Sequence, residues 1–242
     1  MSINIDKFKN FVYLVANKNG RGTLTPVQFN AAAKSGLFTW TNGQLSNWRQ
    51  YSPGRPTPQT SLDLDLVSQA KLRHLKESRE IPVINGMVSI PDGVALDVNG
   101  LVMPDMWMTS KISHKYSNGN TLIRRGIKLV KDMEWDEMMD SSIMPPSKKR
   151  AIANMQSNFL QVEPKGLLNL VNLTYVRNPT SPEWKYTVVN GRPVYDDLNS
   201  IDMDAPESAM NEIAMITLEI IGIKIRDGEL LQAATTMETK GV

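Results

Sequence analysis

The chain has 242 residues, with 27 lysines and arginines against 25 aspartates and glutamates, two histidines and no cysteine. Without cysteine there is no disulfide, thiolate nucleophile, iron–sulfur cluster or cysteine-ligated zinc, so a metal site would have to use carboxylates or histidine. A formal net charge of +2 does not by itself indicate nucleic-acid binding, because that affinity grows with the number of phosphates neutralised. The hydrophobic fraction of 41% is typical of one large or two small globular domains.

Membrane and targeting segments are not expected. The longest apolar region, residues 213–225, is interrupted by polar and charged residues, whereas a transmembrane helix needs about 20 apolar residues. The short apolar stretch 8–16 leads to no small-residue cleavage site, which argues against a signal peptide. We therefore expect a protein made in the cytoplasm, with no membrane partner.

The first 50 residues predict a helix–loop–helix. Apolar residues at helical spacing predict a helix over residues 5–15. A second helix is predicted to begin near Thr25, which suits the N-cap, with Pro26 at the first helical position, and to end at Gly36.

The loop at residues 17–28 aligns with a calcium-binding EF-hand frame, with Gly22 at the sixth position and Leu24 at the eighth. The ligand positions do not follow, because Arg21 stands at the fifth place, where a cation would repel calcium. We interpret the segment as a structural loop whose glycine and asparagine residues accommodate the turn.

A proline-rich segment at residues 51–60 is predicted to link this region to a β-rich body over residues 61–203. Asn-Gly dipeptides favour the type I′ turns of hairpins, and three of them lie between apolar runs. The predicted strand pairs are 81–84 with 87–90, 95–98 with 101–103, and 184–189 with 192–195. A further strand is predicted over residues 167–176, and Pro193 indicates an edge strand.

Residues 204–242 are predicted to form a C-terminal helix and a tail. Asp204, Pro206 and Glu207 have the spacing of a capping box. The predicted buried stripe is Met210, Ile213, Ala214, Thr217, Ile220 and Ile221, before Gly222 weakens the helix. Residues 228–240 are predicted to form a shorter, weaker helical segment. The predicted fold class is α+β: an N-terminal helical hairpin, a mostly antiparallel β body, and a C-terminal helix packed on that body with an extended or helical tail.

The search for catalytic motifs is negative, with no phosphate-binding glycine loop, no metalloprotease motif and no nucleophile elbow. A Ser–His–Asp triad is assembled in space, so the sequence leaves a hydrolase open. His74 lies in a charged, helical segment and His114 lies between Lys111 and Lys115, which suits neither for catalysis. We predict no enzyme activity, no cofactor and no metal site.

Charge is segregated in the middle of the chain. Six basic residues come without an acid between Asp105 and Asp132: Lys111, Lys115, Arg124, Arg125, Lys128 and Lys131. Five acids follow without a base: Asp132, Glu134, Asp136, Glu137 and Asp140. The acids are expected on the polar face of a short helix around Trp135. The two blocks could form the complementary faces of a head-to-tail subunit contact, while contact with DNA phosphates and an ordinary solvated face remain alternatives for the basic segment.

Several segments resemble the neck or connector proteins of tailed bacteriophages, and in particular the ring proteins of crAss-like phages. They are residues 3–33, 135–153, 158–196 and 211–234, and their most specific residues are Tyr175, Arg177, Pro179, Pro182, Trp184 and Tyr186. The resemblance implies a structural subunit of the head–tail connector in the virion neck. It implies a homo-oligomeric ring of twelve copies below the portal protein, in contact with other neck or tail rings, with DNA passing through the lumen. It also implies a docking tail near the C-terminus, for which Leu230, Leu231 and Met237 are candidates.

The leading alternative is a small nucleic-acid-binding module that uses the basic segment Lys111 to Lys131, and a hydrolase is the third. A salt-sensitive DNA complex would favour the first alternative, whereas rings would favour the connector.

Overall fold

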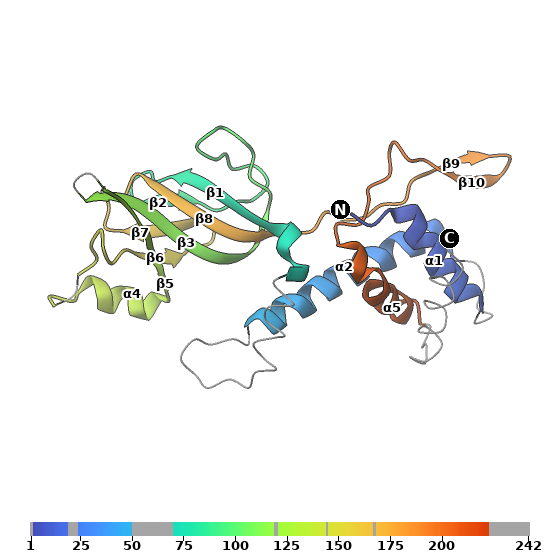
Figure 1. The fold of residues 1–242 in the computed structure, drawn as a ribbon, viewed down its shortest axis with the longest axis horizontal. Helices are drawn as coiled ribbons and strands as arrows, with labels where there is room; N and C mark the ends of the chain where they lie inside the picture. Colours follow the sequence, from blue (N-terminus) through green and yellow to red (C-terminus); the bar gives the residue numbers. More distant parts are fainter. Residues whose placement is uncertain are drawn as a thin grey trace. The chain divides into compact units, whose positions relative to one another are not determined.

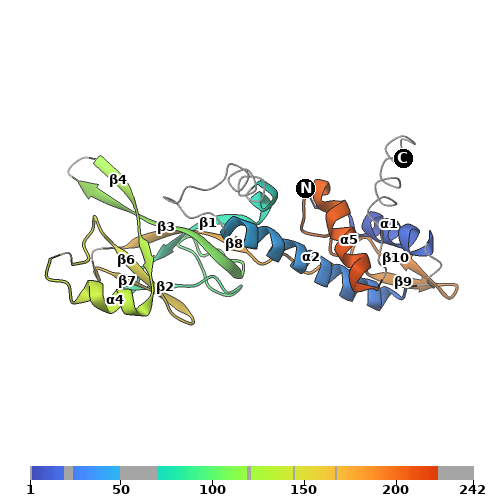
Figure 2. The same cartoon turned by 90° about the horizontal axis from the view of Figure 1, so that it is seen from below.

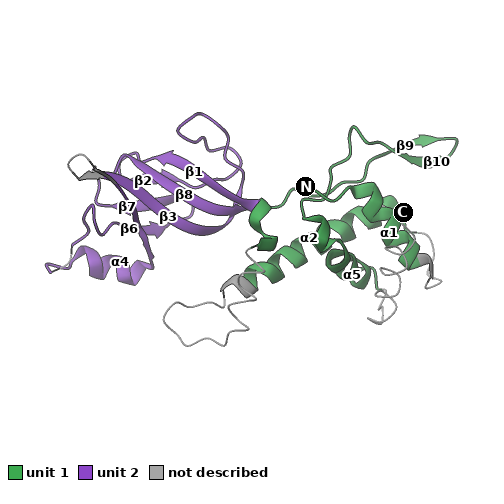
Figure 3. Cartoon of the chain, viewed as in Figure 1, with its two compact units in different colours: residues 1–74, 179–242 green, residues 75–178 purple. Residues whose placement is uncertain are grey.

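The structure is a computed structural model, and it describes residues 2–18, 24–49, 70–118, 121–143, 145–166 and 168–222. The chain forms two compact units, shown in Figures 1 and 3. Unit 1 comprises Met1–His74 and Pro179–Val242, and unit 2 comprises Leu75–Asn178. Unit 1 thus combines an early and a late part of the sequence. The predicted β-rich body spans residues 61–203, whereas unit 2 spans only Leu75–Asn178.

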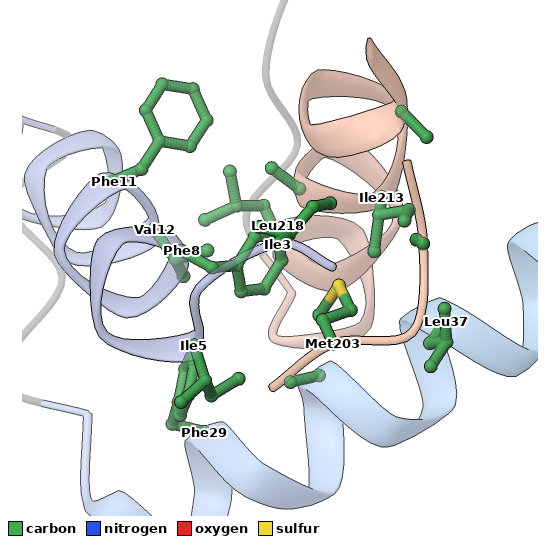
Figure 4. Packing of buried hydrophobic residues seen from close by; sticks show 14 of the residues in the cluster. Ile3, Ile5, Phe8, Phe11, Val12, Phe29, Leu37, Met203, Ile213 and Leu218 are labelled. Atoms are coloured by element: carbon green, nitrogen blue, oxygen red, sulfur yellow. The ribbon is translucent and has the colours of Figure 1, made fainter. Parts of the chain in front are cut away.

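Unit 1 is built on helices α1 (Ile5–Lys18), α2 (Pro26–Arg49) and α5 (Met210–Ile220). It also holds the short 3₁₀ helix η2 (Glu207–Ala209) and the hairpin strands β9 (Tyr186–Val189) and β10 (Arg192–Tyr195), while the 3₁₀ helix η1 (Arg73–Leu75) spans the boundary to unit 2. The predicted first helix is confirmed, since its apolar stripe is fully buried at Ile5, Phe8 and Val12. These side chains pack with α2 and α5 in one hydrophobic core (Figure 4).

Helix α2 begins as predicted but ends later. Thr25 and Gln28 form a reciprocal cap: the Gln28 side chain accepts from the Thr25 amide at 3.1 Å, and Thr25 Oγ1 accepts from the Gln28 amide at 3.4 Å. The predicted end at Gly36 is wrong, because α2 continues to Arg49. Gly36 instead faces Thr217 of α5, so here a glycine serves close helix packing.

Helix α5 differs from prediction in its start and in its packing. The Asp204 carboxylate accepts from the Thr180 amide at 3.2 Å instead of capping the helix, and no side-chain cap bond starts η2 or α5. The buried stripe includes Leu218, whereas Ile220 is 47% exposed. Helix α5 packs against α1 and α2, which corrects the prediction that it packs on the β-rich body.

Unit 2 consists of two four-stranded sheets with a shared core. The first sheet has the order β1 (Lys76–Pro82), β8 (Leu170–Arg177), β3 (Met106–Asn118) and β4 (Thr121–Gly126). The second has the order β2 (Met87–Ser89), β7 (Phe159–Glu163), β6 (Ile152–Met155) and β5 (Lys128–Val130). All pairs are antiparallel except β5 with β6. Inward-facing residues from both sheets, such as Leu173 of β8 and Leu160 of β7, form the core.

The chain crosses between the sheets at both of their edges. It passes from β1 to β2 at one edge, called here the β1–β2 edge, and from β4 to β5 at the other, called the β4–β5 edge. The helix α4 (Asp132–Met139) follows β5 at the second edge. Figures 1 and 2 show α4 and the connection from β2 to β3 at opposite edges of unit 2.

Two of the three Asn-Gly turns form as predicted. Asn85 and Gly86 have φ of 54° and 78°, and Asn190 and Gly191 have 51° and 76°, as type I′ turns require. Only the second turn joins two strands of one sheet, because the strands beside Asn85 belong to different sheets. The predicted strands at 95–98 and 101–103 reduce to a single bridge between Leu96 and Val102.

The predicted α+β class, with N-terminal helices, mostly antiparallel sheets and a C-terminal helix, is confirmed. The predicted strand at 167–176 is present as β8. The proline-rich link at 51–60, residues 19–23 of the EF-hand-like loop, the segment 228–240 and the tail candidates Leu230, Leu231 and Met237 lie outside the described residues.

Candidate assembly surfaces

Half of the predicted basic residues lie on the outer face of the first sheet. Lys111, Ser113 and Lys115 are every second residue of β3 and therefore share one face, and Arg124 on the neighbouring β4 pairs with Lys115. Lys115 Nζ lies 2.7 Å from the Glu80 carboxylate on β1. Arg124 donates to Ser113 at 3.0 Å and to Asn172 of β8 at 2.9 Å. Much of this charge therefore ties neighbouring strands together.

The other predicted charges gather around α4, which confirms the predicted short helix. Trp135 packs with Val130 and Ile152, so the helix is fixed to the second sheet by its apolar face. Lys131 precedes the first turn, and Lys128 Nζ lies 3.3 Å from Glu134 Oε1. The remaining predicted residues are exposed: Arg125 on β4 and Asp132, Asp136, Glu137 and Asp140 at α4. The structure thus brings part of the basic block and the acidic block together at one edge.

A pocket of about 460 Å³ opens at the β4–β5 edge, between α4, the end of β4 and the start of β6. Ala151 and Ile152 of its lining are buried, and Met138 is half-buried. The charged residues of the lining are exposed: Lys128, Glu137, Lys149 and Arg150. The pocket therefore has an apolar floor and a mainly basic rim.

The connection from β2 to β3, residues 91–105, is called here the apolar loop. Five of its apolar side chains are 45 to 77% exposed: Val94, Leu96, Val98, Leu101 and Val102. The loop is nevertheless tied by backbone hydrogen bonds, from the Met106 amide to Pro91 O at 3.0 Å and from the Met103 amide to Ala95 O at 2.8 Å. Apolar side chains held out on an ordered loop are unusual for a surface that only meets water.

Asp97 anchors the tip of this loop. Its carboxylate accepts from the Leu101 and Asn99 amides at 3.0 and 2.8 Å, and Arg79 of β1 lies 3.5 Å away. The hydrogen bond from the Leu101 amide is the main cause that lowers the pKa of Asp97, with the Asn99 amide and Arg79 adding to it against the opposing effect of burial. The ionised carboxylate of Asp97 is thus part of the loop's geometry. On β8, burial raises the pKa of Tyr175 to about 12.

Both histidines have structural contacts. His114 is 1% exposed, and its Nε2 lies 2.8 Å from the Lys148 carbonyl oxygen. The ring of His74 lies between the carbonyl oxygens of Lys71 and Asp204, at 3.0 and 2.9 Å. Among the described residues, neither ring is hydrogen-bonded to a serine or threonine that would start a triad, and no three or more metal-ligating side chains cluster together.

The Trp-x-Tyr element that carries the resemblance is well integrated in unit 1. Trp184 is 2% exposed, donates to Asp6 at 2.9 Å and stacks on Tyr186. The hairpin that follows is different, because nearly all of its residues are exposed, with Val188 at 67% and Val194 at 46%. Only its base packs on the core, since Trp184 stacks on Tyr186 and on Tyr195.

Sequence reasoning located the charged residues but missed the apolar loop and the pocket. Val94, Leu96 and Val98 alternate as in a strand, and neither the bonds of Asp97 nor the exposure of these side chains can be read from that pattern. The pocket combines residues from β4, α4 and β6 that no local pattern links.

Comparison with protein-family models gives no match, and comparison with curated protein sequences gives none either. Among the described residues, none of the helices has the length and apolar character needed to cross a membrane.

Proposed function

We propose that the chain is a structural subunit of the head–tail connector of a tailed bacteriophage. In this proposal it forms a homo-oligomeric ring below the portal, similar to the rings of crAss-like phages, and DNA passes through the lumen. Its place is the virion neck, after assembly in the host cytoplasm with the portal and other neck proteins. No catalysis is involved.

The observation that carries the proposal is the amount of apolar surface that ordered segments expose in both units. The apolar loop of unit 2 exposes five aliphatic side chains, and the hairpin β9–β10 of unit 1 exposes Tyr186, Val188, Val189 and Val194. Such surface is costly in water, at about 25 cal/mol per Å² of apolar area. A subunit that buries it against copies and axial neighbours gains that free energy on assembly.

The choice of a connector ring over other assemblies rests on the resemblance of residues 135–153, 158–196 and 211–234 to phage connector proteins. The experiment is a measurement of particle mass by light scattering over a hundredfold range of protein concentration, followed by negative-stain imaging, with and without the portal. Closed rings, alone or on the portal, are the expected result. A monomer under every condition would contradict the proposal.

Nucleic-acid binding as the main function is the second candidate, favoured by Lys111, Lys115 and Arg124 on one sheet face. The ion pair of Lys115 with Glu80 reduces the charge available to phosphates, and the hydrogen bond of Arg124 to Asn172 occupies one of the donors of its guanidinium group. A DNA affinity of the monomer that falls steeply with salt, and that Lys111→Glu abolishes, would support this alternative. A lining of a DNA channel would show only weak, sequence-independent binding.

A further inference from the structure

We propose that the apolar loop of one copy seats in the pocket beside α4 of the next copy. The inference rests on the proposed ring and specifies its lateral contact. It concerns unit 2 alone, because both surfaces belong to that unit.

The apolar loop and the pocket lie at opposite edges of unit 2. The apolar loop lies at the β1–β2 edge, where the Val98 amide donates to Glu80 O of β1 at 3.0 Å. The pocket lies beside α4 at the β4–β5 edge of the same two sheets. Figure 1 shows α4 at the edge opposite to the connection from β2 to β3. A projection and a recess on opposite edges of one body produce a head-to-tail contact that repeats with a fixed rotation, as a ring requires.

The pocket matches the apolar side chains of the loop in size and polarity. A cavity of about 150 Å³ holds a molecule as large as benzene, so the pocket of about 460 Å³ has room for two or three aliphatic side chains. Leu101 and Val102, which follow the turn at the tip of the loop, are 54% and 56% exposed. The pocket floor of Met138, Ala151 and Ile152 offers these side chains an apolar environment.

The charges of the loop and of the pocket rim are complementary. The only charged residue between Gly93 and Pro104 is Asp97, whose carboxylate the loop itself uses, so the tip presents no charge to the floor. Exposed acids stand at both ends of the loop, Asp92 and Asp105. The pocket rim carries Lys128, Lys149 and Arg150 against Glu137. An uncharged tip with acidic flanks is complementary to an apolar floor with a basic rim.

The absence of cysteine from the sequence allows a direct test. The variant Leu101→Cys with Lys149→Cys places one thiol on the loop tip and one on the pocket rim, and a short bismaleimide then links thiols that lie close together. We expect a ladder of covalent multimers from the assembled double variant. Each single variant alone should give no dimer, and an equal mixture of the two single variants should give a dimer and nothing larger.

A matched control is Leu101→Cys with Lys111→Cys, which moves the second thiol to the outer face of the first sheet and should give no ladder. Rings that form normally but show no Leu101–Lys149 link would overturn the loop-and-pocket contact and leave the connector proposal standing. Dimers from Leu101→Cys alone would show that loops meet each other, which would also overturn it. A protein that remains monomeric and gives no cross-link would contradict both.

A second readout uses the loop without cross-linking. Leu101→Asp with Val102→Asp changes only exposed side chains, so the melting temperature should change little while ring formation falls at least tenfold. Leu198→Asp, at a residue 95% exposed in unit 1, is the control and should assemble normally. Full assembly by the loop variant would overturn the inference.

Discussion

Gly36 of α2 and Thr217 of α5 lie in direct contact, so that a Cβ placed on residue 36 would clash with Thr217 Oγ1. Thr217 is fully buried, and its hydroxyl donates to Ile213 O at 2.8 Å. The threonine is therefore fixed, and the close approach of the two helices depends on the missing side chain of Gly36. The N-terminal and C-terminal parts of unit 1 meet at this point.

We expect Gly36→Ala to destabilise the protein by about 1 to 3 kcal/mol, because the added methyl group overpacks the contact with Thr217. Gly43→Ala in the same helix is the control: a Cβ there meets nothing within 4 Å, so the better helix propensity of alanine should stabilise by about 0.5 to 1 kcal/mol. Urea denaturation measures both. Combining Gly36→Ala with Thr217→Ala should recover part of the loss. Equal stabilities for the two alanine variants would contradict this packing.

The stripe of α5 gives a second prediction. Ile213 is fully buried, so Ile213→Asp places a carboxylate in the core and should cost more than about 3 kcal/mol. Ile220→Asp, on the same helix but 47% exposed, should change stability by about 0.5 kcal/mol. Thermal denaturation followed by circular dichroism compares them, and a normally melting Ile213→Asp protein would rule out the described packing of α5.

Asp97 gives the apolar loop a dependence on pH. The folded pKa of its carboxyl lies below the ordinary value of 3.8, mainly because the Leu101 amide donates to it. A group whose folded pKa is lowered stabilises the protein above the unfolded pKa, and that contribution is lost as the pH falls through the folded value. The stabilisation should therefore be complete above about pH 5 and be lost progressively as the pH falls through the unfolded pKa and toward the lower folded one.

Asp97→Asn should remove this pH dependence and lower the hydrogen-exchange protection of the Leu101 amide at pH 7. Asp136→Asn, which changes an exposed carboxylate on α4, is the control and should leave that protection unchanged. Protection of Leu101 that is the same in the wild type and in Asp97→Asn would show that the carboxylate does not hold the loop.

The charged edge at α4 is tested by reversing Lys128 and Lys131 to glutamate. Lys128 and Glu134 are both about half exposed, so losing their ion pair should cost at most about 1 kcal/mol of stability. If the basic edge contacts acidic residues of the next copy, ring formation should fall, and it should fall most at low salt, where the new like-charge repulsion is least screened. Lys7→Glu with Lys34→Glu makes the same charge change on exposed residues of unit 1 and should assemble normally. Unchanged assembly of the Lys128 and Lys131 variant would exclude these two lysines from the contact.

Local patterns in the sequence predicted the local structure well. The Thr25 cap, the apolar stripe of α1, the hairpin at Asn190 and the short helix around Trp135 follow from capping, periodicity and turn chemistry alone. Gly36 was misread because a glycine that ends a helix and a glycine that admits another helix look the same in one sequence. The Asp204 cap was misread because a distant amide, that of Thr180, takes the carboxylate.

The candidate surfaces were less predictable for the same reason. The alternation of Val94, Leu96 and Val98 suggests a strand, but Asp97 folds the chain into a loop through its bonds to Asn99 and Leu101. The joining of residues 1–74 and 179–242 in one unit depends on tertiary packing of α5 with α2, which no spacing rule reports.

The most direct measurement of the central claim is a reconstruction of the virion neck by electron cryo-microscopy at side-chain resolution. We expect this chain to occupy a closed ring between portal and tail, with identical lateral contacts repeated around the axis. Density for the neck that is fully explained by other proteins, with no copy of this chain, would contradict it.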